Sequence, residues 1–346
     1  MATVRTVLGE IDSARLGVTL FHEHLLNDLS PSWRQPAVED SEGWEIATTP
    51  LRMAYLGRLR NDPYLSLDNT RLDDIELAID EAARFHSAGG STIVEVTPPG
   101  IGRNPSGLRQ IAERTGLNIV MGCGYYLQHT LPPHLADVPI NDIADELSRE
   151  VLEGVDGVHA GVIGEIGVGV DFTPAEERSL RGAARAQKRC GVPLTVHLPG
   201  WRRYGQRVLD IVEEEGANLN ATVLSHMNPS HVDGDYQRAL ADRGAWLEYD
   251  MIGMEFSYPG EGQSPSDEHN ARAVSALLSE GYGRRLLLSH DLFIKTLLHR
   301  FGGFGYDHIL TGFADRLELH GVTREVLLGV LSANPRTVFE TAAEGA

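Results

Sequence analysis

The chain alternates short, apolar, β-branched runs with longer amphipathic stretches, and this alternation leaves few folds open to it. We identify eight candidate strands, at residues 17–24, 91–97, 118–124, 161–166, 192–197, 221–226, 245–250 and 285–291. Amphipathic helical stretches lie between them, at residues 72–86, 105–114, 140–152, 174–189, 203–214 and 271–278. Eight such β/α units predict a (β/α)8 TIM barrel. We expect a single α/β domain, residues 1–346, that opens with a short N-terminal β-hairpin at TVLGEI and caps the barrel floor.

The charge and the cysteine content of the chain indicate which partners it can bind and in which cellular compartment it works. The formal net charge is -19 and the chain has no basic run, which argues against binding to nucleic acid or to an anionic membrane surface. Cys123 and Cys190 are too few for a disulfide framework, and the N-terminus lacks the pattern of a signal peptide. We therefore expect a cytoplasmic protein with a small-molecule substrate. Because barrels of this kind often pair, a homodimer is an open alternative to a monomer.

Six potential metal ligands lie at or near the C-terminal ends of the predicted strands. They are His22, His24, Glu165, His197, His226 and Asp291. Residues two apart in a strand share a face, so both imidazoles of the FHEH segment can reach one ion. Active sites of barrels of this class form at that same end of the strands. The coincidence of six ligands in one place therefore predicts a metal site.

Four nitrogens and two carboxylates suit two divalent ions better than one. We expect His22, His24 and Asp291 to hold the more buried ion, and His197 and His226 the more exposed one. Glu165 would bridge them, because a carboxylate can span ions roughly 3.5–4 Å apart. Zn²⁺ is the expected metal, with Mn²⁺ or Co²⁺ as alternatives.

Two further histidines need a separate interpretation. His290 precedes Asp291 in its strand and should point to the opposite face, toward the helical layer, in a structural role. His129, in the loop after the third strand, is an additional candidate for the pocket lining.

The chain resembles the phosphotriesterase-like family of the amidohydrolase superfamily over essentially its whole length. The matching segments are TVLGEI, LGVTLFHEHLL, TPPGIGRNPSGL, TGLNIVMGCGYY, GVIGEIGV, VPLTVHLPG, VLSHMNPS, LEYDMIGM, LLLSHD and ANPRTVF. The resemblance implies the same five histidine and aspartate ligands and Glu165 as the bridging carboxylate. Many members of the family use a carboxylated lysine as the bridge, and the glutamate of GVIGEIGV is a known variant.

The predicted mechanism uses a hydroxide that bridges the two metals as the nucleophile. Asp291 would contact metal and hydroxide and pass a proton to the leaving group, although it could be a ligand only. Asp250, at the end of the seventh strand, is a second catalytic candidate. The resemblance places an acid there in lactonase-like relatives, where organophosphate-cleaving members have a histidine relay; a structural hydrogen-bonding role is the alternative.

Candidates for substrate binding come from loops at the same end of the barrel. Tyr125 and Tyr126 follow the third strand, and one of the two should face the core. Trp201 and Met254 follow the fifth and seventh strands. Lys295 could meet a substrate carboxylate or lie on the solvated surface.

Glycine and insertion patterns add two expectations about the loops. Gly302, Gly303 and Gly305 would let the last loop flex as a lid, or serve as turns. Two long insertions, at residues 29–67 and 252–270, should shape the pocket.

The predicted function is hydrolysis of a carboxylic ester or lactone, with side activity on phosphate or phosphonate esters. An N-acyl amide hydrolase or a phosphotriesterase is the alternative within the same chemistry. A barrel that binds a small molecule without catalysis is the alternative outside it. A mononuclear iron oxygenase needs only two histidines and one carboxylate, so the surplus of ligands argues against that class.

Overall fold

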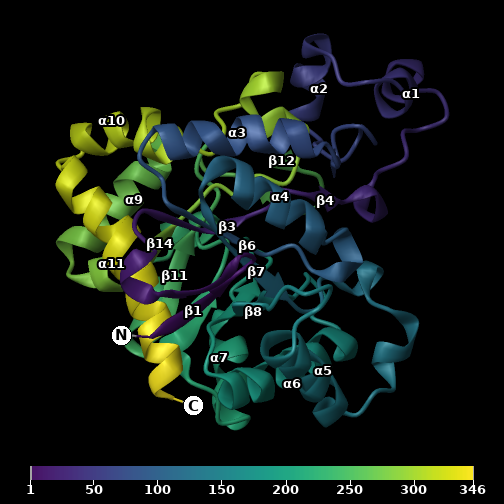
Figure 1. Ribbon diagram of the computed structural model, residues 1–346. Helices are drawn as coiled ribbons and strands as arrows, with labels where there is room; N and C mark the ends of the chain where they lie inside the picture. The colour runs from purple at the N-terminus through teal and green to yellow at the C-terminus, as the bar shows by residue number, and fades with distance from the viewer. Residues whose placement is uncertain (1, 346) are drawn as a thin grey trace.

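The computed structural model describes residues 2–345, and its centre is a sheet of eight parallel strands (Figure 1). In sheet order they are β3 (Thr19–Glu23), β6 (Thr92–Glu95), β7 (Asn118–Cys123), β8 (Val162–Gly167), β9 (Leu194–His197), β10 (Thr222–Leu224), β11 (Trp246–Tyr249) and β14 (Leu286–Leu288). The two ends of the sheet meet where the amide of Asp291 donates to the carbonyl of His22 at 3.2 Å. The predicted TIM barrel and all eight predicted strands are confirmed.

Helices surround the sheet (Figure 1). They are α3 (Ile75–Ser87), α4 (Pro105–Thr115), α5 (Ile140–Leu152), α6 (Pro174–Cys190), α7 (Gly205–Glu214), α8 (Gly234–Asp242), α9 (Asp267–Ser279), α10 (Gly312–Leu319) and α11 (Arg324–Glu344). The six predicted helical stretches are present. Sequence periodicity did not identify α8, α10 and α11, and α11 contains Pro335 in its interior, where proline normally interrupts a helix.

The N-terminal hairpin closes the floor of the barrel. Strands β1 (Thr3–Thr6) and β2 (Gly9–Asp12) pair antiparallel, as predicted. Val4 belongs to a cluster of buried residues that includes Phe21 and Trp246 of the barrel strands. The ring of Phe339 in α11 lies 5.7 Å from that of Phe21 and covers the same end. The floor of the barrel is therefore a buried apolar layer. The active site is expected at the opposite end, where the strands end.

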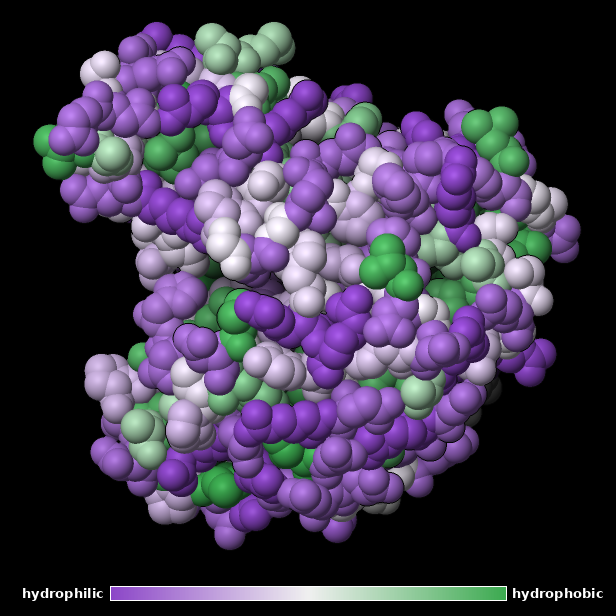
Figure 2. All heavy atoms as spheres, turned by 180° about the vertical axis from the view of Figure 1, so that it is seen from behind, coloured by the Kyte–Doolittle hydropathy of each residue, from purple (hydrophilic) through white to green (hydrophobic). Residues whose placement is uncertain are grey.

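The two predicted insertions both lie at that opposite end. The first carries α1 (Ser41–Thr48) and α2 (Leu56–Leu59), and the strands β4 (Asn27–Asp28) and β5 (Arg71–Leu72) pair at its base. It projects from the barrel in Figure 1, and in Figure 2 the corresponding lobe overhangs a hollow in the surface. The second insertion forms the hairpin of β12 (Ser257–Tyr258) and β13 (Gly262–Gln263).

Two further observations concern the chain as a whole. Within residues 2–345 no helix combines the length and apolar character needed to cross a bilayer. Cys123 and Cys190 are both free thiols, as their low number predicts.

Candidate metal centre

The strands that carry the predicted ligands are locally irregular. The register between β3 and β6 shifts between Leu20 and Glu23, and that between β8 and β9 shifts between Ile163 and Ile166. These two irregularities flank the FHEH segment and Glu165. Such bulges redirect side chains near active sites. The sequence alone predicts a regular strand at both places.

The backbone at two other predicted ligands is strained. His226 has a φ of 58° and Asp291 a φ of 52°, both in the left-handed region that non-glycine residues rarely adopt. This conformation turns each side chain from the strand end toward the barrel axis. Strain of this kind persists where the surrounding contacts fix it, and it gathers at functional sites.

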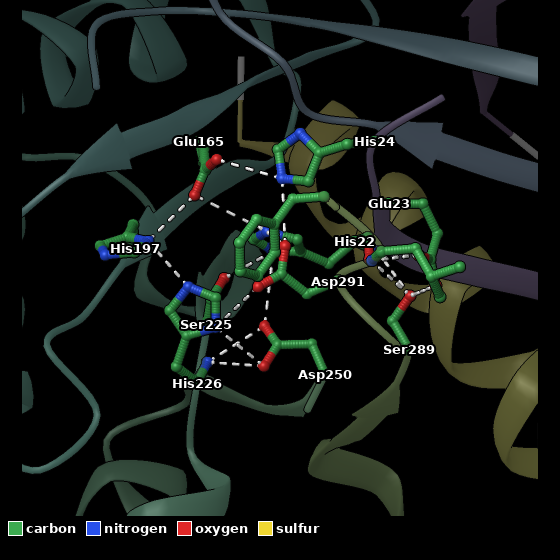
Figure 3. Close-up of polar contacts among 12 residues, drawn as sticks. His22, Glu23, His24, Glu165, His197, Ser225, His226, Asp250, Ser289 and Asp291 are labelled. Carbon is green, nitrogen blue, oxygen red and sulfur yellow. Dashed lines mark hydrogen bonds and ion pairs between the residues drawn. The ribbon is translucent and has the colours of Figure 1, made fainter. Parts of the chain in front are cut away.

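The first group of ligand atoms surrounds the Nε2 atoms of His22 and His24 (Figure 3). The Oδ1 atom of Asp291 lies 3.6 Å from Nε2 of His22 and 3.1 Å from Nε2 of His24. Oxygens of Glu165 lie 3.7 and 3.4 Å from the same two nitrogens. His22, His24 and Asp291 offer ligand atoms within 4.8 Å of one another, so these three side chains could hold one metal ion.

The second group is formed by His197 and His226. The Nδ1 atom of His197 lies 2.7 Å from Nε2 of His226 and 3.1 Å from Oε2 of Glu165. Oε1 of Glu165 faces His24, so its two oxygens point to different histidines. The structure thus brings all six predicted ligands together, with Glu165 between two pairs of imidazoles.

Hydrogen bonds behind three histidines orient their rings. Nδ1 of His24 lies 2.8 Å from Thr97, whose hydroxyl donates to Glu95, and Nδ1 of His22 lies 3.1 Å from Ser225, whose hydroxyl donates to Glu248. Each hydroxyl donates its only hydrogen to a carboxylate. Its oxygen must therefore accept a hydrogen bond from the Nδ1–H group of the imidazole. Each ring therefore carries its proton on Nδ1 and turns its Nε2 lone pair to the centre.

Asp250 does the same for His226, which is the structural hydrogen-bonding role that the sequence left open as the alternative to catalysis. It accepts two hydrogen bonds of 3.0 Å from the amide of His226 and lies 3.0 Å from its Nδ1 atom. Asp250 is fully buried and does not line the pocket, so it cannot contact substrate directly. Its contacts are those of a residue that positions His226.

The charges of the site favour cations. Burial lowers the pKa of His22 and of His197 well below the ordinary value, which keeps both rings neutral. Burial also acts to lower the pKa of His24 and His226, but nearby carboxylates outweigh it and raise these values to about 9 and about 10. Asp291 and Glu165 act on His24, and Asp250 is the main such carboxylate for His226. The carboxylates of the centre therefore attract positive charge strongly enough to outweigh burial at these two rings.

One buried atom tests directly whether these residues fit a metal. Nε2 of His22 is shielded from solvent and has no hydrogen-bond partner, although it points at two carboxylates. An unpaired buried nitrogen costs free energy unless a ligand completes it. Imidazole and carboxylate donors are the set that Zn²⁺ and similar divalent ions prefer. The residues present therefore fit the implied metals.

A separate clamp fixes the loop that carries Asp291. Oε1 of Glu23 accepts from the hydroxyl of Ser289 at 2.7 Å and from the amide of His290 at 2.8 Å, and Oε2 accepts from the amide of Leu292 at 3.0 Å. His290 points away from the metals, as predicted: its Nδ1 lies 2.9 Å from Glu23 and its Nε2 accepts from the amide of Ile309. Glu23 thus holds the backbone on both sides of Asp291.

The six-ligand cluster opens into a pocket that reaches solvent. Five ligands line it: His24, Glu165, His197, His226 and Asp291. The remaining lining residues are mostly apolar or aromatic, and they include Leu29, Ile101, Leu198, Met251 and Phe293. Asp291 is thus both part of the ligand cluster and accessible to a substrate.

Three of the five predicted substrate-binding residues line this pocket. Tyr126 packs its ring against that of His197 at 4.9 Å between centroids, and Trp201 and Met254 line the same pocket. Tyr125 and Lys295 do not line it, which corrects both expectations. Tyr125 turns outward toward Glu146, on the other side of the loop. The ammonium group of Lys295 donates to Asp68 at 2.5 Å and is thereby occupied.

The structure also shows the positions of the glycine-containing last loop and of His129. The amides of Gly303 and Gly305 donate to the carbonyls of Leu298 and Leu297, so these glycines serve turns rather than a flexible lid in this structure. His129 lies against Ser32 at 2.9 Å and does not line the pocket.

Sequence reasoning missed Tyr64 and Glu261, which both line the pocket. Each lies in one of the two insertions, away from the C-terminal end of any barrel strand. The only signal that could have found them was the length of the insertions, which predicted contact with the pocket but not the residue.

Comparisons with known proteins show which family and fold this chain is similar to. A model of the phosphotriesterase family matches residues 2–339. The N-acetyltaurine hydrolase of Danio rerio is 35% identical over 339 residues, which cover 96% of this chain and 96% of that protein. A resiniferatoxin-binding protein from Rhodobacter sphaeroides has a solved structure that is 51% identical, with a TM-score of 0.95 over 98% of this chain and 95% of that one. A phosphotriesterase homology protein from Escherichia coli, solved with phosphate in its active site, is 26% identical with a TM-score of 0.76 over 94% and 99%.

Proposed function

We propose that this chain, which belongs to the phosphotriesterase family and is a metal-dependent hydrolase, cleaves a carboxylic ester or lactone, with side activity on phosphate or phosphonate esters. One observation carries the proposal. Asp291 belongs to the ligand cluster and also lines the pocket, so a group that can move a proton faces the place where a substrate would lie.

Two divalent ions, with Zn²⁺ as the first choice, would be held in two groups. His22, His24 and Asp291 would hold one, His197 and His226 the other, and Glu165 would bridge them. When bound, the ions would supply an acidified water as nucleophile and would polarise the scissile bond.

The chain's own residues then have separate tasks. The Oδ2 atom of Asp291 is turned away from His24 and lies 3.9 Å from the Nδ1 atom of His226, so it is the oxygen available to accept a proton and deliver it to a leaving group. Asp250 and Glu23 hold His226 and the Asp291 loop in place. The apolar lining excludes water from the substrate's flank, which strengthens every electrostatic contact inside.

The shape of the pocket favours a substrate with an apolar portion. Tyr126, Trp201 and Met254 offer broad hydrophobic contact beside the ligand cluster. In a substrate whose scissile carbonyl lies next to Glu165, the acyl and leaving groups would contact these apolar side chains. Tyr126, whose ring lies against that of His197, also offers a phenolic hydroxyl that could hydrogen-bond such a substrate.

An N-acyl amide is the second candidate, because relatives at 34–35% identity are named N-acetyltaurine hydrolases. The same residues would act, with greater need for proton delivery by Asp291. The named substrate of those relatives carries a sulfonate. Within residues 2–345 the pocket lining contains no Lys or Arg that would pair with such a group, so we rank the ester first.

A substrate panel tests the proposal. Protein loaded with Zn²⁺ or Mn²⁺ is assayed against matched carboxylic esters, lactones, N-acyl amides and phosphotriesters. We expect esters or lactones to exceed phosphotriesters in kcat/KM by at least about 100-fold, roughly 2.7 kcal/mol of transition-state preference. An amide as the best substrate would select the second candidate, and a phosphotriester would refute the ranking.

Resiniferatoxin belongs in the same experiment as a probe, because the 51% identical Rhodobacter protein is described as binding it. Binding by calorimetry together with its chemical integrity after incubation separates a ligand from a substrate. If the metal-loaded protein binds members of the panel but turns over none, the chain is a binding barrel and the hydrolase proposal fails.

A further inference from the structure

One wall of the metal pocket is aromatic, and its rim carries a carboxylate. We call the side chains of Tyr64, Trp201, Tyr258 and Phe293 the aromatic wall. The ring of Tyr64 lies 6.0 Å from that of Tyr258 and 6.1 Å from that of Phe293, and the ring of Trp201 lies 5.7 Å from that of Tyr258. Glu261, in the turn between β12 and β13, lines the same pocket.

No basic side chain forms an ion pair with this carboxylate among the described residues. Among residues 2–345, no Lys or Arg lines the pocket, and no ion pair within 4.0 Å involves Glu261. Arg34 is the basic residue nearest to the rim, but its Nη1 donates to the carbonyl of Pro259 at 2.7 Å and its guanidinium lies over Tyr64 at 5.7 Å. Lys295 is held by Asp68. The lining of the pocket therefore combines the carboxylate of Glu261 with the aromatic wall, and Arg34 is a positive charge outside that lining.

We propose that Glu261 and the aromatic wall select substrates by charge: the group remote from the scissile bond is preferably cationic, next uncharged, and least favourably anionic. This rests on the proposed function and names a substrate class for it. Aromatic faces attract cations within about 6 Å of the ring centroid, and the effect is largest for quaternary ammonium groups. A carboxylate at the same rim attracts the cation and repels an anion. Both terms act in the same direction.

Three butyrate esters of matched shape test this preference. Butyrylcholine carries a quaternary ammonium group, 3,3-dimethylbutyl butyrate is its uncharged counterpart, and 2-sulfoethyl butyrate is anionic. All three have the same acyl group and a primary alkoxide as leaving group, so leaving-group differences are small. Rates are followed by pH-stat with metal-loaded protein at low salt, because screening weakens charge effects.

We expect kcat/KM to be at least about tenfold higher for butyrylcholine than for the sulfoethyl ester. Glu261→Gln should lower that ratio about fivefold to tenfold, and Glu261→Lys should lower it further. Arg34→Gln should move the ratio in the opposite direction, because it removes a nearby positive charge. Glu39→Gln is the control, since Glu39 is an exposed carboxylate of the first insertion that does not line the pocket.

The outcomes separate this proposal from the proposed function. Turnover of the uncharged ester reports hydrolysis, and the ratio between charged esters reports selection. If no ester is hydrolysed, calorimetric binding of the three esters gives the same ratio without turnover. A sulfoethyl ester that reacts or binds as well as butyrylcholine, or a ratio that Glu261→Gln leaves at the wild-type value, would overturn the selection by Glu261.

Discussion

The inner and outer parts of the pocket are built in different ways. At the inner end, every ligand projects from or directly follows a barrel strand, and buried partners such as Asp250 fix its ring or carboxylate. At the outer end, Tyr64 and Glu261 come from two insertions that the barrel itself does not require. Position at the inner end follows from the closed sheet, whereas position at the outer end follows from loop packing.

This difference teaches that chemistry and specificity are encoded separately in the chain. Substitutions at the inner end should change metal content and rate for every substrate. Substitutions at the outer end should change the ranking of substrates while metal content stays constant. The following experiments can break this division or sharpen it.

The largest effect is expected at Glu165. Wild-type protein should carry close to two divalent ions per chain, and Glu165→Gln should lose metal and activity together, because a neutral amide bridges two cations poorly. Bound metals stabilise the transition state by several kcal/mol, so their loss should lower kcat by roughly 10³-fold or more. Metal analysis by mass spectrometry and steady-state kinetics measure both. Full metal occupancy at an unchanged rate would refute the bridging role.

Asp291 allows the roles of ligand and proton carrier to be separated. Asp291→Asn keeps one coordinating oxygen but removes the proton acceptor, so the rate should fall by roughly 10²–10⁴ while metal content falls much less. Aryl esters, whose phenolates leave without a proton, should lose less than alkyl esters. Equal and small losses for both ester types in the metal-replete variant would show that Asp291 is a ligand only.

Glu23 lies between His22 and His24 in sequence but accepts hydrogen bonds from the loop that follows β14. Glu23→Gln removes the charged acceptor for the backbone amides of His290 and Leu292, and we expect roughly a 10- to 100-fold loss in kcat or in metal affinity. The matched control is Glu176→Gln, because Glu176 is equally buried but accepts from Thr173 and Gln128 at a helix start. The control should lose stability without a change in kcat/KM. If both variants lose only stability, Glu23 has no positioning role.

The same division explains how much the sequence could predict. The eight strands and the convergence of the ligands follow from hydrophobic patterning, because residues such as His197 and His226 end strands whose carboxyl ends must meet in a barrel. The direction of a loop side chain does not follow from the pattern. Tyr125 and Tyr126 are neighbours in sequence, and only the packed loop decides that Tyr126 faces His197.

Other misses have equally local causes. Lys295 was expected near substrate from its distance along the chain to Asp291, but Asp68, from the first insertion, captures its ammonium group. Asp250 ends a strand in the expected place, yet the left-handed backbone of His226 brings that ring over it. Long-range pairing and backbone strain of this kind leave no signal in a single sequence.

The smallest effect is expected at the outer end, at Tyr64. Tyr64 lines the pocket and does not belong to the ligand cluster, so Tyr64→Phe should leave metal content unchanged and alter kcat/KM by about two- to tenfold, the value of one hydrogen bond or its loss. The change should differ between substrates, because a hydroxyl contact discriminates among the groups that reach it. Tyr55→Phe is the matched control: the hydroxyl of Tyr55 donates to Glu45 within the same insertion, away from the pocket, so the variant should alter thermal stability alone. If Tyr64→Phe reduced every substrate equally and lowered metal content as well, the inner and outer ends would be one coupled unit, and the separation of chemistry from specificity would be wrong for this protein.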